Sequence, residues 1–264
     1  MSVAPLATDP TPAGHLRVDG LRVEHHGRAV VADATVSLRA GQIVALVGSS
    51  GSGKTMTARA LLGLVPLRPG VVGGRICFEV DGTTYTPRAE ADFRPLRGSV
   101  VGMLWQDARG ALDPLRTVGA QLREAATLAR TEADVLGGLT RVGFTDPDHV
   151  AACYPHTLSG GMAQRAAIAV ALARKSRFLL ADEPTTGLDP AVQREVLAQL
   201  RSAATAGTGI LFITHDLRLL PGFADTIVVM DEGRTVEEAS CVSGLRGAGR
   251  ALVEATRKIA GGVL

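Results

Sequence analysis

The chain has 264 residues, of which 46% are hydrophobic and 20% are charged, and its formal net charge is +2 at pH 7. These are values of a globular protein, and the length fits one α/β domain with room for an inserted subdomain. A charge this close to neutral gives no electrostatic reason to expect nucleic-acid binding. The three cysteines, Cys77, Cys153 and Cys241, are too far apart for a metal-ligand pattern, so we expect inert thiols in a reducing compartment.

Residues 1–14 are rich in proline, threonine and alanine, and they lack both the basic start and the apolar centre of a signal peptide. We expect them to form a disordered lead-in. The longest uncharged apolar run, Ala166–Ala173, is far shorter than the roughly 20 residues that cross a bilayer. The sequence therefore predicts a soluble chain that reaches a membrane only through partner proteins.

The clearest motif is a glycine-rich loop between a predicted strand and a predicted helix. The apolar run Gln42–Val47 predicts a buried strand, and Met56–Leu64, which contains no proline, predicts a helix. The loop between them matches the pattern G-x-x-x-x-G-K-[ST] of phosphate-binding loops. Its residues are Gly48, Ser49, Ser50, Gly51, Ser52, Gly53, Lys54 and Thr55.

The residue types of this loop suit a polyphosphate. Glycines let the backbone curl so that many N–H groups approach one anion, and the first turn of the helix adds unpaired N–H groups. Lys54 can reach the β- and γ-phosphates, and the Thr55 hydroxyl can ligate Mg²⁺. The alternative is a Gly/Ser-rich connection with a surface lysine, but it does not explain the spacing. We therefore expect a nucleotide site here.

The segments around this loop predict β-structure. Leu16–Val31 and Ala34–Leu38 alternate apolar and polar residues, with turn signals at Asp19-Gly20 and His26-Gly27, and predict an antiparallel sheet edge. Later segments predict two hairpins, a single strand and a closing helix. They are Arg75–Val80 with Thr83–Tyr85, Thr226–Met230 with Arg234–Glu237, the strand Ser99–Trp105 and the helix Ala251–Ile259.

From Gln106 to Thr157 the pattern changes. Leu122–Arg130 and Ala133–Val142 have helical spacing, and no strand signal is present. We predict a helical subdomain at residues 106–158 that is inserted into the α/β core. A further helix opens at Leu158–Arg165, continues to Ala173 and is apolar nearly all round.

Two carboxylates follow the apolar strand Phe178–Ala181. In a nucleotide-binding α/β fold, Asp182 would hold Mg²⁺, and Glu183 would orient or deprotonate the attacking water. The alternative is a polar strand end that caps the next turn. Because the phosphate-binding loop lies upstream, the pair favours the functional interpretation.

Two more polar residues are candidates for the same site. Asp189 precedes Pro190 and is therefore a predicted helix N-cap, and a functional role can coexist with capping. His215 follows the predicted strand Gly209–Thr214, at the end where open α/β sheets bind ligands. Taken alone, such a histidine is more typical of a structural residue.

Together these segments resemble the ATP-binding subunit of ABC transporters, from about Leu16 to Glu237. Gln106 stands at that family's Q-loop position, and Gly187-Leu188-Asp189 resembles its D-loop. The other matching segments are the loop Gly48–Thr55, the signature Leu158–Arg165, the strand Phe178–Glu183 and Thr214-His215-Asp216. A finer similarity, to the peptide/nickel importer branch, is carried by Trp105-Gln106-Asp107, Ala111–Pro114, Thr117–Gly119 and Tyr154–Gly161.

The resemblance implies an α/β P-loop NTPase (ABC ATPase) core with an antiparallel β subdomain and the inserted helical subdomain, over residues 15–264. Its ligands would be ATP and Mg²⁺. Glu183 would be the general base, His215 would contact the γ-phosphate, and Gln106 would couple the site to the helical subdomain. The implied metal contacts are Thr55, Gln106 and Asp182. Ser159, Gly160, Gly161 and Asp189 would serve the nucleotide across an interface between two such subunits.

The implied partners are two transmembrane permease subunits, a second ATPase subunit and, indirectly, an extracytoplasmic solute-binding protein, with no nucleic acid. The branch resemblance favours a paralogue over a second copy as the other ATPase. The chain would then lie peripherally at the cytoplasmic face of the inner membrane. There it would power import of peptides, nickel or a related small solute.

Two positions depart from the family pattern. His26 stands where the family places an aromatic residue that stacks on adenine, and imidazole offers less surface for stacking. Ala108 replaces a proline that is common after the Q-loop. Two rival functions are a soluble ABC-type ATPase acting on DNA or ribosomes and a regulatory module with a decayed ATPase. The first would show long heptad segments or two cassettes, the second lost catalytic positions, and the sequence shows neither.

Overall fold

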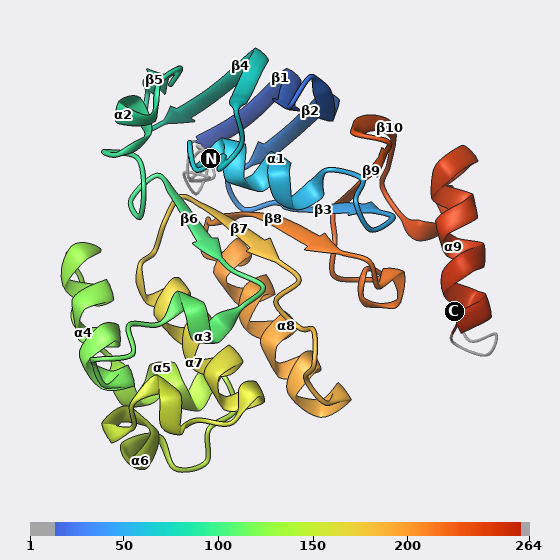
Figure 1. The fold of residues 1–264 in the computed structure, drawn as a ribbon. Coiled ribbons are helices and arrows are strands. Elements are labelled where there is room, and N and C mark those ends of the chain that lie inside the picture. Colours follow the sequence, from blue (N-terminus) through green and yellow to red (C-terminus); the bar gives the residue numbers. More distant parts are fainter. Residues whose placement is uncertain (1–13, 260–264) are drawn as a thin grey trace, which may run out of the picture.

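The computed structural model describes residues 14–259 and contains a ten-stranded sheet in the order β5-β4-β1-β2-β10-β9-β3-β8-β7-β6 (Figure 1). The strands are β1 (Gly14–His25), β2 (Arg28–Arg39), β3 (Ile43–Gly48), β4 (Pro69–Val80), β5 (Thr83–Tyr85), β6 (Val101–Leu104), β7 (Phe178–Asp182), β8 (Gly209–Thr214), β9 (Thr226–Asp231) and β10 (Arg234–Ala239). The helices are α1 (Lys54–Leu61), α2 (Glu90–Phe93), α3 (Ala108–Ala111), α4 (Val118–Leu128), α5 (Val135–Arg141), α6 (Pro147–Ala152), α7 (Gly160–Ala173), α8 (Pro190–Thr205) and α9 (Gly247–Ile259). The predicted α/β class and the predicted strands are therefore confirmed, with ends shifted by a few residues.

Three of the parallel strands, β3, β7 and β8, are buried on both faces. Every residue of β3, β7 and β8 is buried, which explains why these strands appear in the sequence as continuous apolar runs. Ile43, Ala45 and Val47 of β3 belong to a core shared with α7 and α8. Val44 and Leu46 belong to a second core, shared with α1 and the antiparallel strands.

The antiparallel strands β1, β2 and β4 form a layer on the other side of α1 (Figure 1). The hairpin turn predicted at His26-Gly27 is confirmed, and both residues have positive φ angles, +46° and +75°. The turn predicted at Asp19-Gly20 is wrong. These two residues lie inside β1, where the pairing register shifts between Val18 and Leu21, so the dipeptide forms a bulge.

The predicted boundary between the N-terminal lead-in and the first strand differs by one residue from the structure. Gly14, which we expected in the disordered lead-in, begins β1 and pairs with Val80 of β4. Residues 1–13 of that predicted lead-in lie outside the described residues.

Between β6 and α7 the chain forms helices and loops and no strand, while the inserted subdomain at residues 106–158 stays a prediction. The helices α3 to α6 form a group below the sheet in Figure 1. The sequence did not predict α6, although the carboxylate of Asp146 caps it by accepting the N–H of His149 at 3.0 Å. Within residues 14–259 no helix has the length and apolarity to cross a bilayer.

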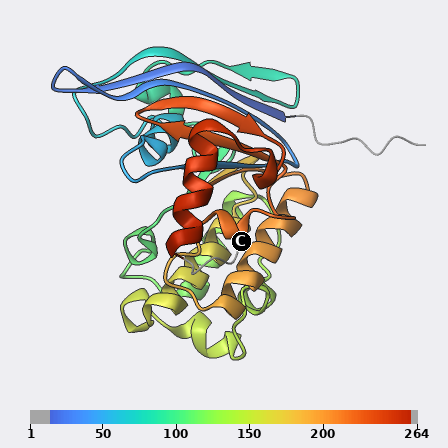
Figure 2. The ribbon, with the colours of Figure 1, turned by 90° about the vertical axis from the view of Figure 1, so that its right-hand side faces the viewer.

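The closing helix α9 begins four residues earlier than Ala251, the start that the sequence predicted. The Glu237 carboxylate of β10 accepts the N–H groups of Arg246 and Gly249, the latter at 3.0 Å, and so satisfies donors at the helix start. The helix packs beside β9 and β10, in front of the sheet in Figure 2.

Candidate functional site

The sheet order brings the predicted site segments to one edge. β3, β8, β7 and β6 are neighbouring parallel strands, so their carboxyl ends lie side by side. The loop Gly48–Thr55 follows β3, His215 follows β8, Glu183 follows β7, and Gln106 lies two residues beyond β6. Segments that are far apart in the sequence therefore meet where α/β sheets bind ligands.

Two glycines of the loop after β3, Gly48 and Gly53, are required by backbone geometry. A Cβ on Gly48 would lie 2.2 Å from the carbonyl oxygen of Met230, closer than real Cβ atoms come. Gly53 is the N-cap of α1 and has a φ of +101°. Residues other than glycine rarely adopt this backbone conformation. The loop consequently presents a curled backbone that ends at a helix N-terminus, as expected for an anion site.

The Lys54 side chain is held inside this curl and is only 7% exposed. Its Nζ donates to the carbonyl oxygens of Gly48 at 2.9 Å and Ser49 at 2.8 Å, and to the Ser52 hydroxyl at 3.3 Å. Burial lowers the pKa of Lys54, and the nearby carboxylates of Glu183 and Asp182 partly oppose this shift. The ammonium group is thus fixed within the predicted phosphate cradle.

Asp182, the last residue of β7, is 2% exposed. Burial raises the pKa of its carboxyl, while a hydrogen bond from Thr55 and the cations Lys54 and Arg59 oppose the rise. A carboxylate beside a hydroxyl is an oxygen donor pair of the kind that Mg²⁺ prefers. The residues present at this point therefore fit the metal that the sequence predicts.

Glu183 lies at the centre of the polar contacts. Its Oε1 is 2.9 Å from Nδ1 of His215, and its Oε2 accepts from Nε2 of Gln106 at 3.3 Å. The Thr186 hydroxyl also donates to Oε2, at 3.2 Å. The Glu183 side chain is 19% exposed, whereas that of His215 is 63% exposed. The structure thus brings together three residues that the sequence singled out separately.

Four further residues predicted for the site lie at the N-termini of α7 and α8. They are Ser159, Gly160, Gly161 and Asp189. Ser159 caps α7 by accepting the N–H of Met162 at 3.3 Å, and both Ser159 and Gly160 are exposed. The predicted cap at Asp189 is confirmed, because its carboxylate accepts two N–H groups of the first turn of α8. Within residues 14–259, no hydrogen bond joins Ser159, Gly160, Gly161 or Asp189 to the Gly48–Thr55 loop.

His26 lies in the exposed turn between β1 and β2, and its ring centroid is 4.2 Å from that of His25. The structure shows the place of this residue but no contact that assigns it to a nucleotide base. The prediction that it faces the base therefore stays a prediction.

Sequence patterns assigned no individual role to two contributors. The Thr186 hydroxyl bonds Glu183, and the buried Gln164 amide donates to the carbonyl oxygen of Pro184 at 2.8 Å. A signal existed only for Gln164, a polar residue on a helix that is otherwise largely apolar. A threonine in a turn carries no comparable signal.

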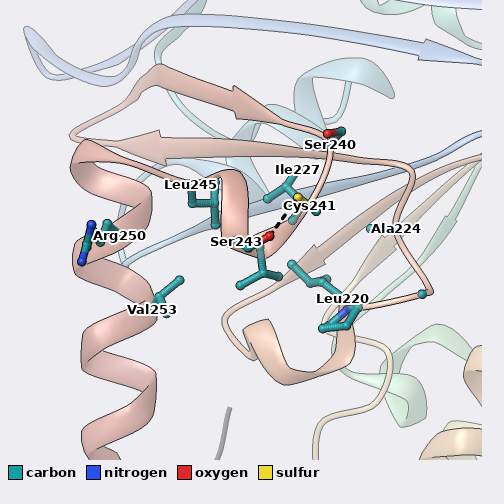
Figure 3. A pocket seen from close by; sticks show the side chains of 12 residues that line it. Leu220, Ala224, Ile227, Ser240, Cys241, Ser243, Leu245, Arg250 and Val253 are labelled. Carbon is teal, nitrogen blue, oxygen red and sulfur yellow. Dashed lines mark hydrogen bonds between the residues drawn. The ribbon is translucent and has the colours of Figure 1, made fainter.

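A separate pocket lies between α9 and the ends of β9 and β10 (Figure 3). Its walls include Leu220, Ile227, Leu245 and Val253, and the Cys241 thiol lies 3.2 Å from the Ser243 hydroxyl. None of the site residues predicted from the sequence lines it. This pocket is therefore separate from the contacts among Glu183, Gln106 and His215.

Comparison with known proteins agrees with the resemblance seen in the sequence. The peptidoglycan transport ATP-binding protein YejF of Agrobacterium fabrum is 41% identical over 234 residues, which cover 84% of this chain but 42% of that protein. The nickel import ATP-binding protein NikD of Rhodospirillum rubrum is 38% identical over 236 residues, which cover 84% of this chain and 87% of that protein. The chain therefore spans less than half the length of some curated relatives and most of the length of others.

A solved structure and a family model also relate this chain to ABC transporters. The structure of an ATP-binding subunit of an ABC transporter matches with a TM-score of 0.70 and 25% identity, over 91% of this chain and 98% of that one. A family model described as "ABC transporter" matches residues 31–186, more than half of the chain. The predicted family and the predicted fold are both confirmed, and this chain belongs to the ABC transporter family.

Proposed function

We propose that this chain binds and hydrolyses ATP and so powers an importer of peptides, nickel or a related small solute. The observation that carries the proposal is the contact of Glu183 with Gln106 and His215, beside a loop that encloses Lys54. The names of the relatives add support, because they include peptidoglycan transport, oligopeptide transport and nickel import ATP-binding proteins. These names favour transport over the rival function on DNA or ribosomes.

In this proposal, different residues bind the phosphates and activate the attacking water. Backbone N–H groups of the Gly48–Thr55 loop and the Lys54 ammonium bind the β- and γ-phosphates of ATP. Glu183 accepts a proton from the attacking water, and His215 and Gln106 hold the Glu183 carboxylate in place. His215 also contacts the γ-phosphate.

Thr55, Asp182 and Gln106 are the residues that would hold Mg²⁺. When bound, this ion neutralises charge on the phosphate oxygens. The buried position of Asp182 supports this role, since a buried carboxylate is stabilised by a bound cation.

A second ATPase subunit completes the nucleotide site in this proposal. Ser159 and Gly160 are exposed at the start of α7 and make no hydrogen bond to the loop of their own chain. Exposed N–H groups at a helix N-terminus suit the γ-phosphate of a nucleotide held by a partner. We propose that Ser159, Gly160, Gly161 and Asp189 serve that nucleotide, and that a paralogue is the partner. His26 faces the base.

The permease subunits dock on the helical subdomain, residues 106–158 of an ATPase domain that spans residues 15–264. A groove between this subdomain and the α/β core supports this part of the proposal. It is lined by Ala111 and Leu112 of the subdomain and, on the other side, by residues that include Leu64, Arg97 and Trp105. Trp105 precedes Gln106, so a partner in the groove lies next to the catalytic contacts. The chain then lies peripherally on the cytoplasmic face of the inner membrane, with a solute-binding protein acting indirectly.

Phosphate release by the assembled complex of this chain with its partner subunits tests the hydrolysis. We expect release from ATP that requires Mg²⁺ and stops when EDTA removes the ion. A wild-type complex that binds ATP but releases no phosphate at any Mg²⁺ concentration would contradict the proposal.

A further inference from the structure

Gln164 is a buried polar residue whose contact the proposed mechanism does not use. It lies in α7 and is only 6% exposed. Its Nε2 donates a hydrogen bond of 2.8 Å to the carbonyl oxygen of Pro184, the residue that follows Glu183. A buried amide that loses its partner is destabilising, so this contact has a defined energetic role.

The segment that begins at Glu183 has an unusual backbone. Glu183 has a φ of +47°, in the left-handed region that favours glycine. A non-glycine residue stays in such a conformation only where surrounding contacts enforce it. Within the segment, the N–H of Thr186 donates to the carbonyl oxygen of Glu183 at 3.2 Å. This bond closes the turn but does not fix its position in the protein.

Contacts from outside fix that position. The N–H of Glu183 donates to the carbonyl oxygen of Ile213 in β8 at 3.0 Å. On the side of α7, the Leu188 side chain lies 3.7 Å from the point where a Cβ on Gly161 would be. Within residues 14–259, Gln164 provides the one hydrogen bond between a side chain of α7 and this segment.

We propose that Gln164 is a positioning residue for the base Glu183. By holding the Pro184 carbonyl, it keeps the turn in the conformation that directs the Glu183 carboxylate toward Gln106 and His215. The proposal rests on the ATP hydrolysis proposed above. Because α7 also begins at the exposed Ser159 and Gly160, this hydrogen bond links the base to the surface proposed to meet the partner subunit.

Two substitutions of Gln164 test the role. Gln164→Met keeps the side-chain volume and removes the donor, and Gln164→Glu places carboxylate oxygens against the Pro184 carbonyl. A misplaced catalytic group costs about 10- to 100-fold in rate, so we expect a kcat loss of this size for Gln164→Met and a larger loss for Gln164→Glu. The KM for ATP should stay within about twofold, because the phosphate-binding loop is untouched.

Gln121→Met is the matched control. Gln121 is another buried helical glutamine, 7% exposed, whose Nε2 donates to the carbonyl oxygens of Asp113 and Arg116 at 3.0 Å each. It lies in the helical subdomain, away from Glu183. Its substitution should lower the melting temperature and leave kcat unchanged.

A double variant separates positioning from general damage. If Gln164 acts through Glu183, adding Gln164→Met to Glu183→Gln should not slow single-turnover hydrolysis further. A double variant slowed by the product of the two single effects would overturn the proposal. So would a Gln164→Met protein with wild-type kcat. If Gln164→Met does not fold, Gln164→Asn gives the same comparison, since its amide is one methylene too short. A wild-type complex of this chain with its partner subunits that shows no ATPase activity would instead overturn the proposed function, and this role with it.

Discussion

The Nδ1 atom of His215 lies 2.9 Å from Oε1 of Glu183, although the two residues follow different strands. The Glu183 side chain is mostly buried and the His215 side chain is mostly exposed, so the pair extends from the protein interior to the surface. Gln106 approaches the other carboxylate oxygen. The carboxylate is thereby held from two sides in one orientation, as a general base requires.

Glu183→Gln should slow ATP hydrolysis by roughly 10²- to 10⁴-fold, the usual contribution of a general base. ATP should still bind, because Lys54 and the loop backbone are unchanged. Phosphate release and the affinity for a fluorescent ATP analogue measure the two effects separately. Turnover that survives the substitution would remove Glu183 from this role.

Lys54→Ala should weaken ATP binding itself. The substitution removes the ammonium group that the loop carbonyls of Gly48 and Ser49 hold in the cradle. Charge-assisted hydrogen bonds contribute about 1.5–3 kcal/mol, so we expect the affinity to fall at least about tenfold. Titration with the same ATP analogue measures this loss, and an unchanged affinity would contradict the phosphate contact.

Gly48→Ala should damage the loop through overlap with the Met230 carbonyl oxygen, 2.2 Å from the added Cβ. Overpacking of this kind costs about 1–3 kcal/mol, so the free energy of unfolding should fall by that amount and ATP binding should weaken. Gly73→Ala is the control, because its added Cβ would meet nothing closer than 3.5 Å, at Arg22. Equal stability losses in chemical denaturation would refute the role of the close approach at Gly48.

Asp225→Asn should lower stability in a pH-dependent way. The Arg201 guanidinium donates to both oxygens of Asp225, at 2.8 and 2.7 Å, and with the N–H of Ile43 it holds the pKa of this carboxyl below its usual value. A lowered folded-state pKa stabilises the fold above the unfolded-state pKa, and this stability is lost as pH falls through the folded-state value. At pH 7 we expect a loss of about 1 kcal/mol, reduced by solvent screening.

Melting temperatures from pH 7 down to acid measure this effect. The curves of wild type and Asp225→Asn should converge below the usual pKa of an aspartate, about 3.9. Asp33→Asn is the control, because the ion pair of the Asp33 carboxylate with Arg234 is exposed and 4.0 Å long. A gap between wild type and Asp225→Asn that stays constant down to acid pH would contradict the ion-pair explanation.

Local patterns predicted the parts of the fold that local physics determines. The strand β3, the loop Gly48–Thr55 and the helix α1 follow from an apolar run, glycine spacing and helical composition. Asp19-Gly20 shows the limit, because the same dipeptide forms a turn or a bulge according to how its neighbours pair across the sheet. The helix α6 was missed even though Asp146-Pro147 is a helix-start signal.

The candidate site likewise has features that the local sequence predicts and features that it does not. The positions of Asp182, Glu183 and His215 at strand ends could be predicted, since the carboxyl ends of parallel strands share one edge. The contacts among these residues depend on the strand order, which no short segment specifies. The hydrogen bond from Gln164 to Pro184 likewise exists only because α7 packs beside the turn after β7.

The central claim, that this chain powers an importer, is tested most directly by its partners. The tagged chain would be extracted from its native membranes in mild detergent, and the proteins recovered with it would be identified by mass spectrometry. We predict two integral membrane subunits and a second, paralogous ATPase. Recovery without any membrane protein, or with ribosomes or DNA-processing factors, would contradict the importer function.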